Sequence, residues 1–371
     1  MEALPKLVAA LDGTRHYIPH SASGTVSGFG PYGVRDPKWY FGNTPDTLHS
    51  ERGLPNIPAY ESLIAMLTPE HAWPIDDVWG MHDFTKNGAQ SGGAFLDYMN
   101  RHYAAPKDLA SFATTAQWVN YENHKALFEA MYTGRRNGIL MWMSQSAWPS
   151  MVWQTYDYYY DTNAGYFGAK KANQPINVIL DPRDATLWLS NATPDERKDL
   201  TFTVTVFDLH GKRIHQASVK ETLQPDSRKA WEKIPMKKGA TPIQFVRATV
   251  TDSSGKEIAD NFTWMNRESY LDYRVLAHIA DATVSIRRSR LTREGGQMRG
   301  TLRVANTSDV PALMVRIKAA KPDGERILPV YYSDNYIALM PGETREITFD
   351  FAEKDAGGQK PVFTVEGWNV K

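Results

Sequence analysis

Cysteine is absent from this 371-residue sequence. Its absence excludes disulfides, thiolate metal sites and a cysteine nucleophile, but it leaves the cellular compartment open. No stretch approaches the roughly 18 uninterrupted apolar residues that a membrane-spanning helix needs. The 42 basic and 42 acidic residues cancel, so the overall charge gives no indication of a nucleic-acid or membrane partner. Residues 1–11 lack a basic segment followed by an apolar core, and no signal peptide is predicted.

Several catalytic motifs are missing as well. The sequence contains no GxSxG, HExxH or P-loop pattern, which argues against the serine hydrolases, zinc peptidases and nucleotide hydrolases that use them. The histidines do not fall at metal-ligand spacings. Neither a metal nor an organic cofactor is therefore predicted.

Aromatic residues are abundant: 11 Trp, 18 Tyr and 14 Phe make up 12% of the chain. They gather at residues 39–41 and again at residues 142–160. Aromatic clusters usually fill cores. Trp and Tyr in loops beside acids and amides also form platforms on which sugars stack, and the composition leaves both interpretations open.

In residues 1–172 the spacing of apolar residues indicates strands and helices that alternate along the chain. The patterns predict strands at 14–19, 38–41, 47–50 and 138–144, the last of them buried, and helices at 59–67 and 109–132. Side chains capable of chemistry follow the strands, as in part of a β/α barrel.

From residue 173 onward apolar and polar residues alternate between turn signals. Strands are predicted at 186–190, 200–208, 213–219, 243–251, 261–264, 283–287, 298–305, 312–319, 347–351 and 362–368. Two blocks of this kind, 173–266 and 267–371, read as two immunoglobulin-like β-sandwich domains. The predicted fold class is thus multidomain, α/β followed by all-β.

One carboxylate, Glu51, stands at the end of the predicted strand 47–50, in the stretch "DTLHSERGLPNIPAYESL". An acid before Gly and Pro is usually a solvated loop residue. The residues around it do not by themselves decide between that and a functional role.

Four stretches in this order resemble the second half of the barrel of glycoside hydrolase family 2, closest to its exo-β-D-glucosaminidases and then to its β-mannosidases and endo-β-mannosidases. They are "LDGTRHYIPHSAS", "GFGPYGVRDPKWYF", "LHSERGLPNIPAYESL" and "GILMWMSQSAWPSMVWQTYDYYYDTNAGYFGAKKANQP". "DNFTWMN" and the last hundred residues resemble the sandwich domains that follow. The resemblance implies the C-terminal half of a (β/α)8 TIM barrel in residues 1–172, then the two sandwiches.

The resemblance also implies the chemistry of an O-glycosyl hydrolase. In the family the Glu after Ser at the end of the seventh barrel strand is the catalytic nucleophile, and Glu51 matches it. A retaining glycosidase needs a second carboxylate about 5 Å away to protonate the leaving oxygen. His49 and Tyr40 are candidates for donating a hydrogen bond that keeps Glu51 ionised, and packing in the core is the equal alternative for each.

The family's acid/base residue precedes the first of these stretches, and nothing in this sequence matches it. We therefore expect a truncated, split or partner-dependent chain that is inactive alone, with the missing N-terminal half as a possible partner. A carbohydrate-binding remnant and a structural module without catalysis remain as alternatives.

The substrate implied by the resemblance is a β-linked oligosaccharide, of chitosan type first, with a β-mannoside or β-galactoside as alternatives. Asp36, Asp157 and Asp161 are candidates for holding a 2-ammonium group, although each is also typical of a turn or cap. The predicted sugar-stacking residues are Trp39, Tyr40, Trp142 and Trp148. The protein is expected to be periplasmic or secreted if an upstream signal exists, and otherwise cytoplasmic.

Overall fold

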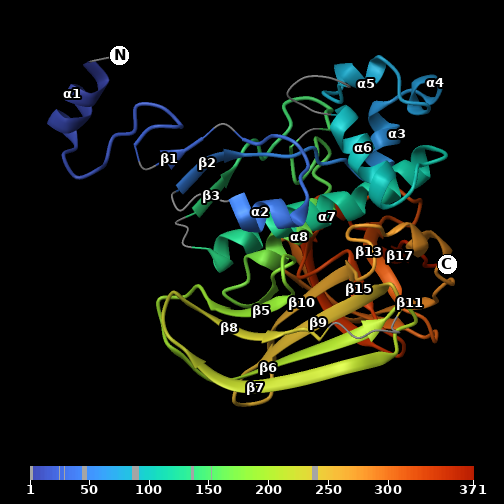
Figure 1. The fold of residues 1–371 in the computed structure, drawn as a ribbon. Helices are drawn as coiled ribbons and strands as arrows, with labels where there is room; N and C mark the ends of the chain where they lie inside the picture. Colours follow the sequence, from blue (N-terminus) through green and yellow to red (C-terminus); the bar gives the residue numbers. More distant parts are fainter. Residues whose placement is uncertain are drawn as a thin grey trace.

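The computed structural model describes residues 3–24, 26–28, 30–43, 48–85, 92–134, 138–151, 153–235 and 241–371. Helices and a short sheet lie on one side of the molecule, and antiparallel sheets fill the other (Figure 1). In the described residues, no helix combines the length and apolarity needed to cross a bilayer.

The α/β part is built around a small parallel sheet. Its elements are α1 (Ala3–Leu11), β1 (Val26–Ser27), α2 (Pro37–Asn43), β2 (Leu48–Arg52), α3 (Tyr60–Met66), α4 (Pro69–Ala72), α5 (Val78–Met81), α6 (Gly92–His102), α7 (Leu109–Thr133), β3 (Gly138–Met141) and α8 (Ala164–Ala172). The strand order is β1-β2-β3, and both pairings are parallel. The strand that carries Glu51, β2, is therefore the central one.

Three of the predicted strands need correction. Residues 14–19 form turns and irregular backbone, because the Asp12 carboxylate accepts hydrogen bonds from the backbone N and the hydroxyl of Thr14. Residues 38–41 are helical and belong to α2. The strand predicted at 138–144 ends at Met141 and is not buried, since β3 lies at the sheet edge and Leu140 is 55% exposed.

The start of α2 explains the second correction. Asp36 accepts a hydrogen bond from the backbone N of Lys38 (2.7 Å), as an N-cap residue does, and Pro37 occupies the first helical position. The signal was present in "DPKWYF", but the aromatic run after it suggested a strand.

The long helix α7 organises the α/β part. Its N-terminus has a capping box, in which the Asp108 carboxylate accepts from Ser111 N (2.7 Å) and Ser111 Oγ accepts from Asp108 N (3.1 Å). Most of its residues are buried, because α7 packs against α2 and α8 and shares a hydrophobic core with both sandwiches. Asn120 of α7 bonds both the N and the O of Ile57 (3.1 and 2.8 Å), so the helix fixes the chain that follows β2.

The rest of the chain is antiparallel. The first sandwich contains β4 (Ile176–Leu180), β5 (Thr186–Asn191), β6 (Arg197–Asp208), β7 (Arg213–Leu223), β8 (Ser227–Lys233), β9 (Ile243–Thr251) and β10 (Glu257–Asn266), in sheets β4-β5-β8 and β10-β9-β6-β7. After the 3-10 helix η1 (Arg274–His278), the second contains β11 (Val284–Glu294), β12 (Gln297–Asn306), β13 (Ala312–Ala320), β14 (Tyr331–Tyr332), β15 (Ile337–Leu339), β16 (Thr344–Ala352), the 3-10 helix η2 (Glu353–Ala356) and β17 (Val362–Glu366). Its sheets run β11-β12-β16-β14 and β15-β13-β17.

Strand β9 shows how the parts are joined. Its even-numbered residues Val246, Ala248 and Val250 belong to the core between the two sheets of the first sandwich. Ile243 and Phe245 point the other way and belong to the core shared by α7 and the second sandwich. Alternation along one strand therefore buries both of its faces.

Candidate active site

The backbone at the end of β2 is held from both sides. Gly30 N donates to Glu51 O (3.0 Å), and Trp142 N donates to Arg52 O (2.7 Å). The loops after β1 and β3 thus continue the pairing beyond the short strands. Glu51 is fixed at the end of the central strand by its neighbours on each side.

The carboxylate of Glu51 is hydrogen-bonded by hydroxyl groups. Tyr32 Oη donates to Glu51 Oε2 (2.7 Å). The side-chain hydroxyls of Ser21 and Tyr32, in that order, lower the pKa of Glu51 from its ordinary value. Glu51 is therefore ionised at neutral pH, as a nucleophile must be.

His49 lies next to this carboxylate in a neutral form. Burial and the nearby charge of Arg52 lower the pKa of His49 to about 4. Its Nδ1 accepts a hydrogen bond from Glu51 N (3.3 Å). His49 thus contacts the backbone of Glu51, and the donors that lower the carboxylate pKa most are Ser21 and Tyr32.

A cluster of three aromatic rings adjoins Glu51. The ring of Tyr32 lies 5.5 Å from that of Trp153 and 6.2 Å from that of Trp142, and the two indoles are 6.5 Å apart. Trp142 is 37% exposed, whereas Trp153 is 7% exposed. The cluster therefore offers one accessible indole beside the carboxylate.

Gly53 makes room for this cluster. A Cβ at position 53 would lie 3.3 Å from Trp142 Cβ and 3.3 Å from Trp153 Cγ. A larger residue there would push the indoles away from the end of β2.

The four predicted sugar-stacking residues have different surroundings. Trp142 joins the cluster beside Glu51, but Trp148 bonds Met81 O of α5 (3.3 Å). Tyr40 is only 1% exposed, and its hydroxyl donates to Asn123 Oδ1 (3.3 Å). Trp39 packs on the core and lies 5.4 Å from the Arg52 guanidinium.

The three aspartates considered for an ammonium group have structural partners. Asp36 accepts from Lys38 N and from the hydroxyl of Tyr270. Asp157 accepts from backbone N atoms of its own turn, and Asp161 pairs with Arg316 and Arg326 (2.7 and 3.1 Å). Asp36 and Asp157 thus act as cap and turn residues, and Asp161 forms ion pairs with the second sandwich.

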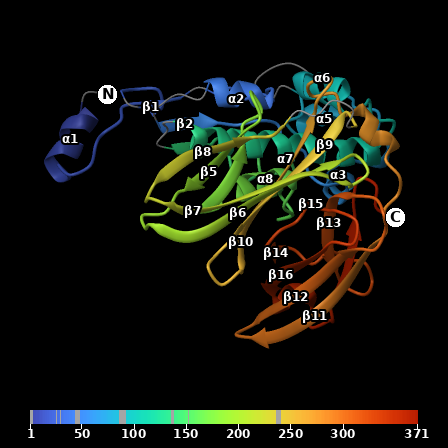
Figure 2. The ribbon, with the colours of Figure 1, turned by 60° about the horizontal axis from the view of Figure 1, so that its bottom comes forward.

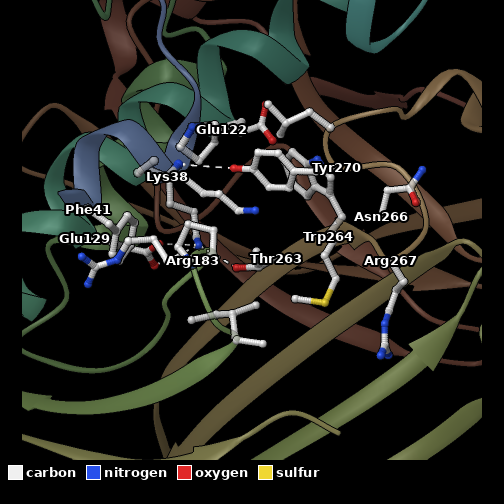
Figure 3. A pocket seen from close by; sticks show the side chains of 18 of the residues that line it. Lys38, Phe41, Glu122, Glu129, Arg183, Thr263, Trp264, Asn266, Arg267 and Tyr270 are labelled. Carbon is white, nitrogen blue, oxygen red and sulfur yellow. Dashed lines mark hydrogen bonds and ion pairs between the residues drawn. The ribbon is translucent and has the colours of Figure 1, made fainter. Parts of the chain in front are cut away.

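Within the described residues, no other carboxylate is among the groups that shift the pKa of Glu51, and no group of three or more His, Asp or Glu side chains could hold a metal ion. A cavity of about 360 Å³ lies elsewhere, between α2, α7 and β10 (Figure 3). Glu122 lines this cavity, and burial raises its pKa to about 8. Lys38 also lines it, and its Nζ lies 3.6 Å from the centroid of the Tyr270 ring. Glu51 does not line it.

The sequence interpretation missed Ser21, Tyr32 and Trp153. The motif "GFGPYGVR" contains Tyr32, but its contact with Glu51 spans 19 residues and depends on the loop between β1 and α2. No local pattern encodes such a contact.

Comparisons with known proteins agree with this fold. Residues 183–267 match the mannosidase Ig/CBM-like domain, and residues 261–370 match the exo-beta-D-glucosaminidase Ig-fold domain. The exo-beta-D-glucosaminidase of Streptomyces avermitilis is 29% identical over 99% of this chain and 44% of its own length. The mannosylglycoprotein endo-beta-mannosidase of Lilium longiflorum is 27% identical over 97% of this chain and 46% of its own.

A solved structure shows the same arrangement. The exo-chitosanase CsxA of Amycolatopsis orientalis superposes with a TM-score of 0.85 at 25% identity, over 95% of this chain and 46% of that one. The chain thus spans less than half the length of these relatives.

The fold and these matches define a class: the chain carries Ig-fold domains of the exo-β-D-glucosaminidase and mannosidase type, and its homologues are glycoside hydrolases. The partial match is consistent with a C-terminal portion of a glycoside hydrolase family 2 enzyme.

Proposed function

We propose that Glu51 is the nucleophile of a retaining β-glycosidase acting on β-linked glucosamine oligosaccharides of chitosan type. The ionised carboxylate at the end of the central parallel strand, bonded by Tyr32, is the observation that carries this proposal. Attack of Glu51 on the anomeric carbon would form a glycosyl-enzyme, which water then hydrolyses.

The second carboxylate comes, in this proposal, from polypeptide outside these 371 residues. Departure of an alcohol requires a proton donor, and no carboxyl group among the described residues contributes to the pKa shift of Glu51. The parallel order β1-β2-β3, with α3 to α7 between β2 and β3, supports half of a TIM barrel in residues 1–172. Residues 173–266 and 267–371 are then the two sandwich domains.

Glucosamine is the preferred sugar because relatives and a solved neighbour are named exo-β-D-glucosaminidase and exo-chitosanase. A β-mannoside is the runner-up, on the name of the Lilium relative. The exposed Trp142 beside Tyr32 favours a second function, carbohydrate binding without turnover.

The test compares the 371-residue chain with a longer polypeptide that supplies the preceding barrel half. Hydrolysis of p-nitrophenyl β-D-glucosaminide, β-D-mannoside and β-D-galactoside is followed for both. We expect turnover by the longer polypeptide only, fastest on the glucosaminide. Binding of glucosamine oligomers by both forms, with turnover by neither, would favour the binding function.

A further inference from the structure

The hairpin formed by β11 and β12 is strongly basic in a chain whose overall charge is zero. Residues 284–306 contain six arginines and a single acidic residue, Glu294. The balance of 42 basic and 42 acidic residues therefore conceals a local excess of positive charge.

Strand register places four of these arginines on one face. Arg287 lies opposite Arg303, Arg290 opposite Thr301, and Arg299 opposite Thr292. These positions follow one another at two-residue steps along β12, so their side chains point to the same side of the sheet. All four arginines are exposed. We call Arg287, Arg290, Arg299 and Arg303 the arginine face.

The positive charges of this face outnumber the negative ones: two acidic residues of β16 share it, Glu346 opposite Arg303 and Asp350 opposite Arg299. Arg299 lies 3.7 Å from Asp350. In the part of the chain that the structure describes, Arg287, Arg290 and Arg303 have no carboxylate within ion-pair distance. Like charges directly opposite each other, such as Arg287 and Arg303, destabilise a sheet. A ligand of opposite charge would remove this repulsion.

The face lies far from Glu51. In both views β11 lies at the end of the molecule remote from β1 and β2, and Figure 2 shows β12 beside it (Figures 1 and 2). A chitosan chain is cationic and would be repelled by the arginines. The face is therefore not an extension of the proposed substrate site.

We infer that the arginine face binds a linear polysaccharide that carries carboxylate or sulfate groups. Guanidinium groups bind such anions through paired N–H donors, and the sheet presents them in rows along which an extended polymer can lie. Residues 284–306 contain no Trp, Tyr or Phe, and the exposed Tyr331 of β14, opposite Asp350, is a single aromatic side chain on this face rather than a row on which successive bases stack. The choice of a polysaccharide among polyanions rests on the proposed glycosidase function.

The test measures binding of the full chain to heparin and to polygalacturonate at about 0.15 M salt, where surface charges farther apart than about 8 Å are screened. Duplex DNA and phosphatidylglycerol vesicles are measured alongside. The triple variant Arg287→Gln, Arg290→Gln, Arg303→Gln removes three charges from the face. A matched triple variant, Lys212→Gln, Arg228→Gln, Lys256→Gln, removes three exposed charges from the first sandwich.

We expect heparin or polygalacturonate to bind, the face variant to weaken binding about 10-fold or more, and the matched variant to change it less than about 2-fold. Melting temperatures should stay equal, which separates lost binding from lost folding. The inference is overturned if neither polysaccharide binds, if both variants lose binding equally, or if DNA or vesicles bind more tightly than both polysaccharides. Because no hydrolysis is measured, failure here is distinct from failure of the proposed glycosidase function.

Discussion

The two sides of the α/β part differ in how completely they are packed. Around Glu51 the strands have two to five residues, and Leu140, Trp142 and Met143 are 55, 37 and 41% exposed. On the opposite side α7 and α8 are largely buried against one another and the sandwiches. We call the part around Glu51 the open side, and the packing of α7 and α8 against one another and against the sandwiches the seam. The groups suited to chemistry lie on the open side, and the packing that stabilises the α/β part lies at the seam.

Charged groups reinforce this seam. Arg316 of β13 reaches Glu61 of α3 and Asp161 of the loop before α8, both at 2.7 Å. Although burial opposes ionisation of Glu61, Arg316 and then Lys318 lower its pKa to about 2. The seam is therefore stabilised by ionised Glu61 above its ordinary pKa, and this contribution is lost as pH falls from about 4.5 toward 2.

The largest expected effect is on the open side. Glu51→Gln, in a polypeptide that also holds the missing carboxylate, should lower kcat at least about 10³-fold, because an amide cannot form the glycosyl ester. The melting temperature should not change, since the side chain is partly exposed. Glu70→Gln, at an exposed helix position, is the matched control. Comparable losses in both variants would contradict the role of Glu51.

The next effect is at the seam. Arg316→Met leaves Glu61 and Asp161 without their buried partner, and should lower the free energy of unfolding by about 3–5 kcal/mol. Arg299→Met removes an exposed pair at 3.7 Å and should cost less than about 1 kcal/mol. Urea unfolding measures both, and equal values would show that the seam contributes no more than the surface does.

A smaller effect tests helix packing at the same seam. A Cβ on Gly168 of α8 would lie 2.4 Å from Tyr121 O of α7, so Gly168→Ala must separate the helices, at about 1–3 kcal/mol. A Cβ added to Gly42 of α2 would have no atom within 4 Å. Gly42→Ala should stabilise by up to about 1 kcal/mol. Thermal unfolding of both variants distinguishes a seam contact from a general effect of alanine.

The smallest effect concerns protonation on the open side. Tyr32→Phe removes a hydrogen bond that favours the ionised carboxylate, so the pKa of Glu51 should rise. The acidic limb of the kcat/KM profile should then move to higher pH, with little change in stability. Tyr158→Phe, at a 45% exposed position, should leave the profile unchanged. If the acidic limb of the profile stays at the same pH in Tyr32→Phe, the bond from Tyr32 does not control the pKa of Glu51.

The same contrast explains which features the sequence predicted. Most sandwich strands and α7 were found because their apolar residues recur at regular spacing: β9 (Ile243–Thr251) has the predicted bounds, and α7 extends the predicted helix by one residue. The strands β4, β8, β14 and β15 were missed, and β4, buried along its whole length, shows no alternation. The short elements of the open side were harder, since Val26–Ser27 is too short to show a period and Trp39–Phe41 resembled a strand. Glu51 was recognisable from its motif, whereas the residues that bond it come from separate loops.

The most direct test of the central role of Glu51 is covalent labelling of the longer polypeptide with 5-fluoro-β-D-glucosaminyl fluoride. Fluoride departs without protonation, and the ring fluorine slows both steps, so a glycosyl-enzyme should accumulate. Peptide mass spectrometry should find one glucosaminyl adduct on the peptide that contains Glu51, and none in Glu51→Gln. An adduct on another carboxylate, or sustained turnover by the Glu51→Gln variant, would contradict the assignment of Glu51 as the nucleophile.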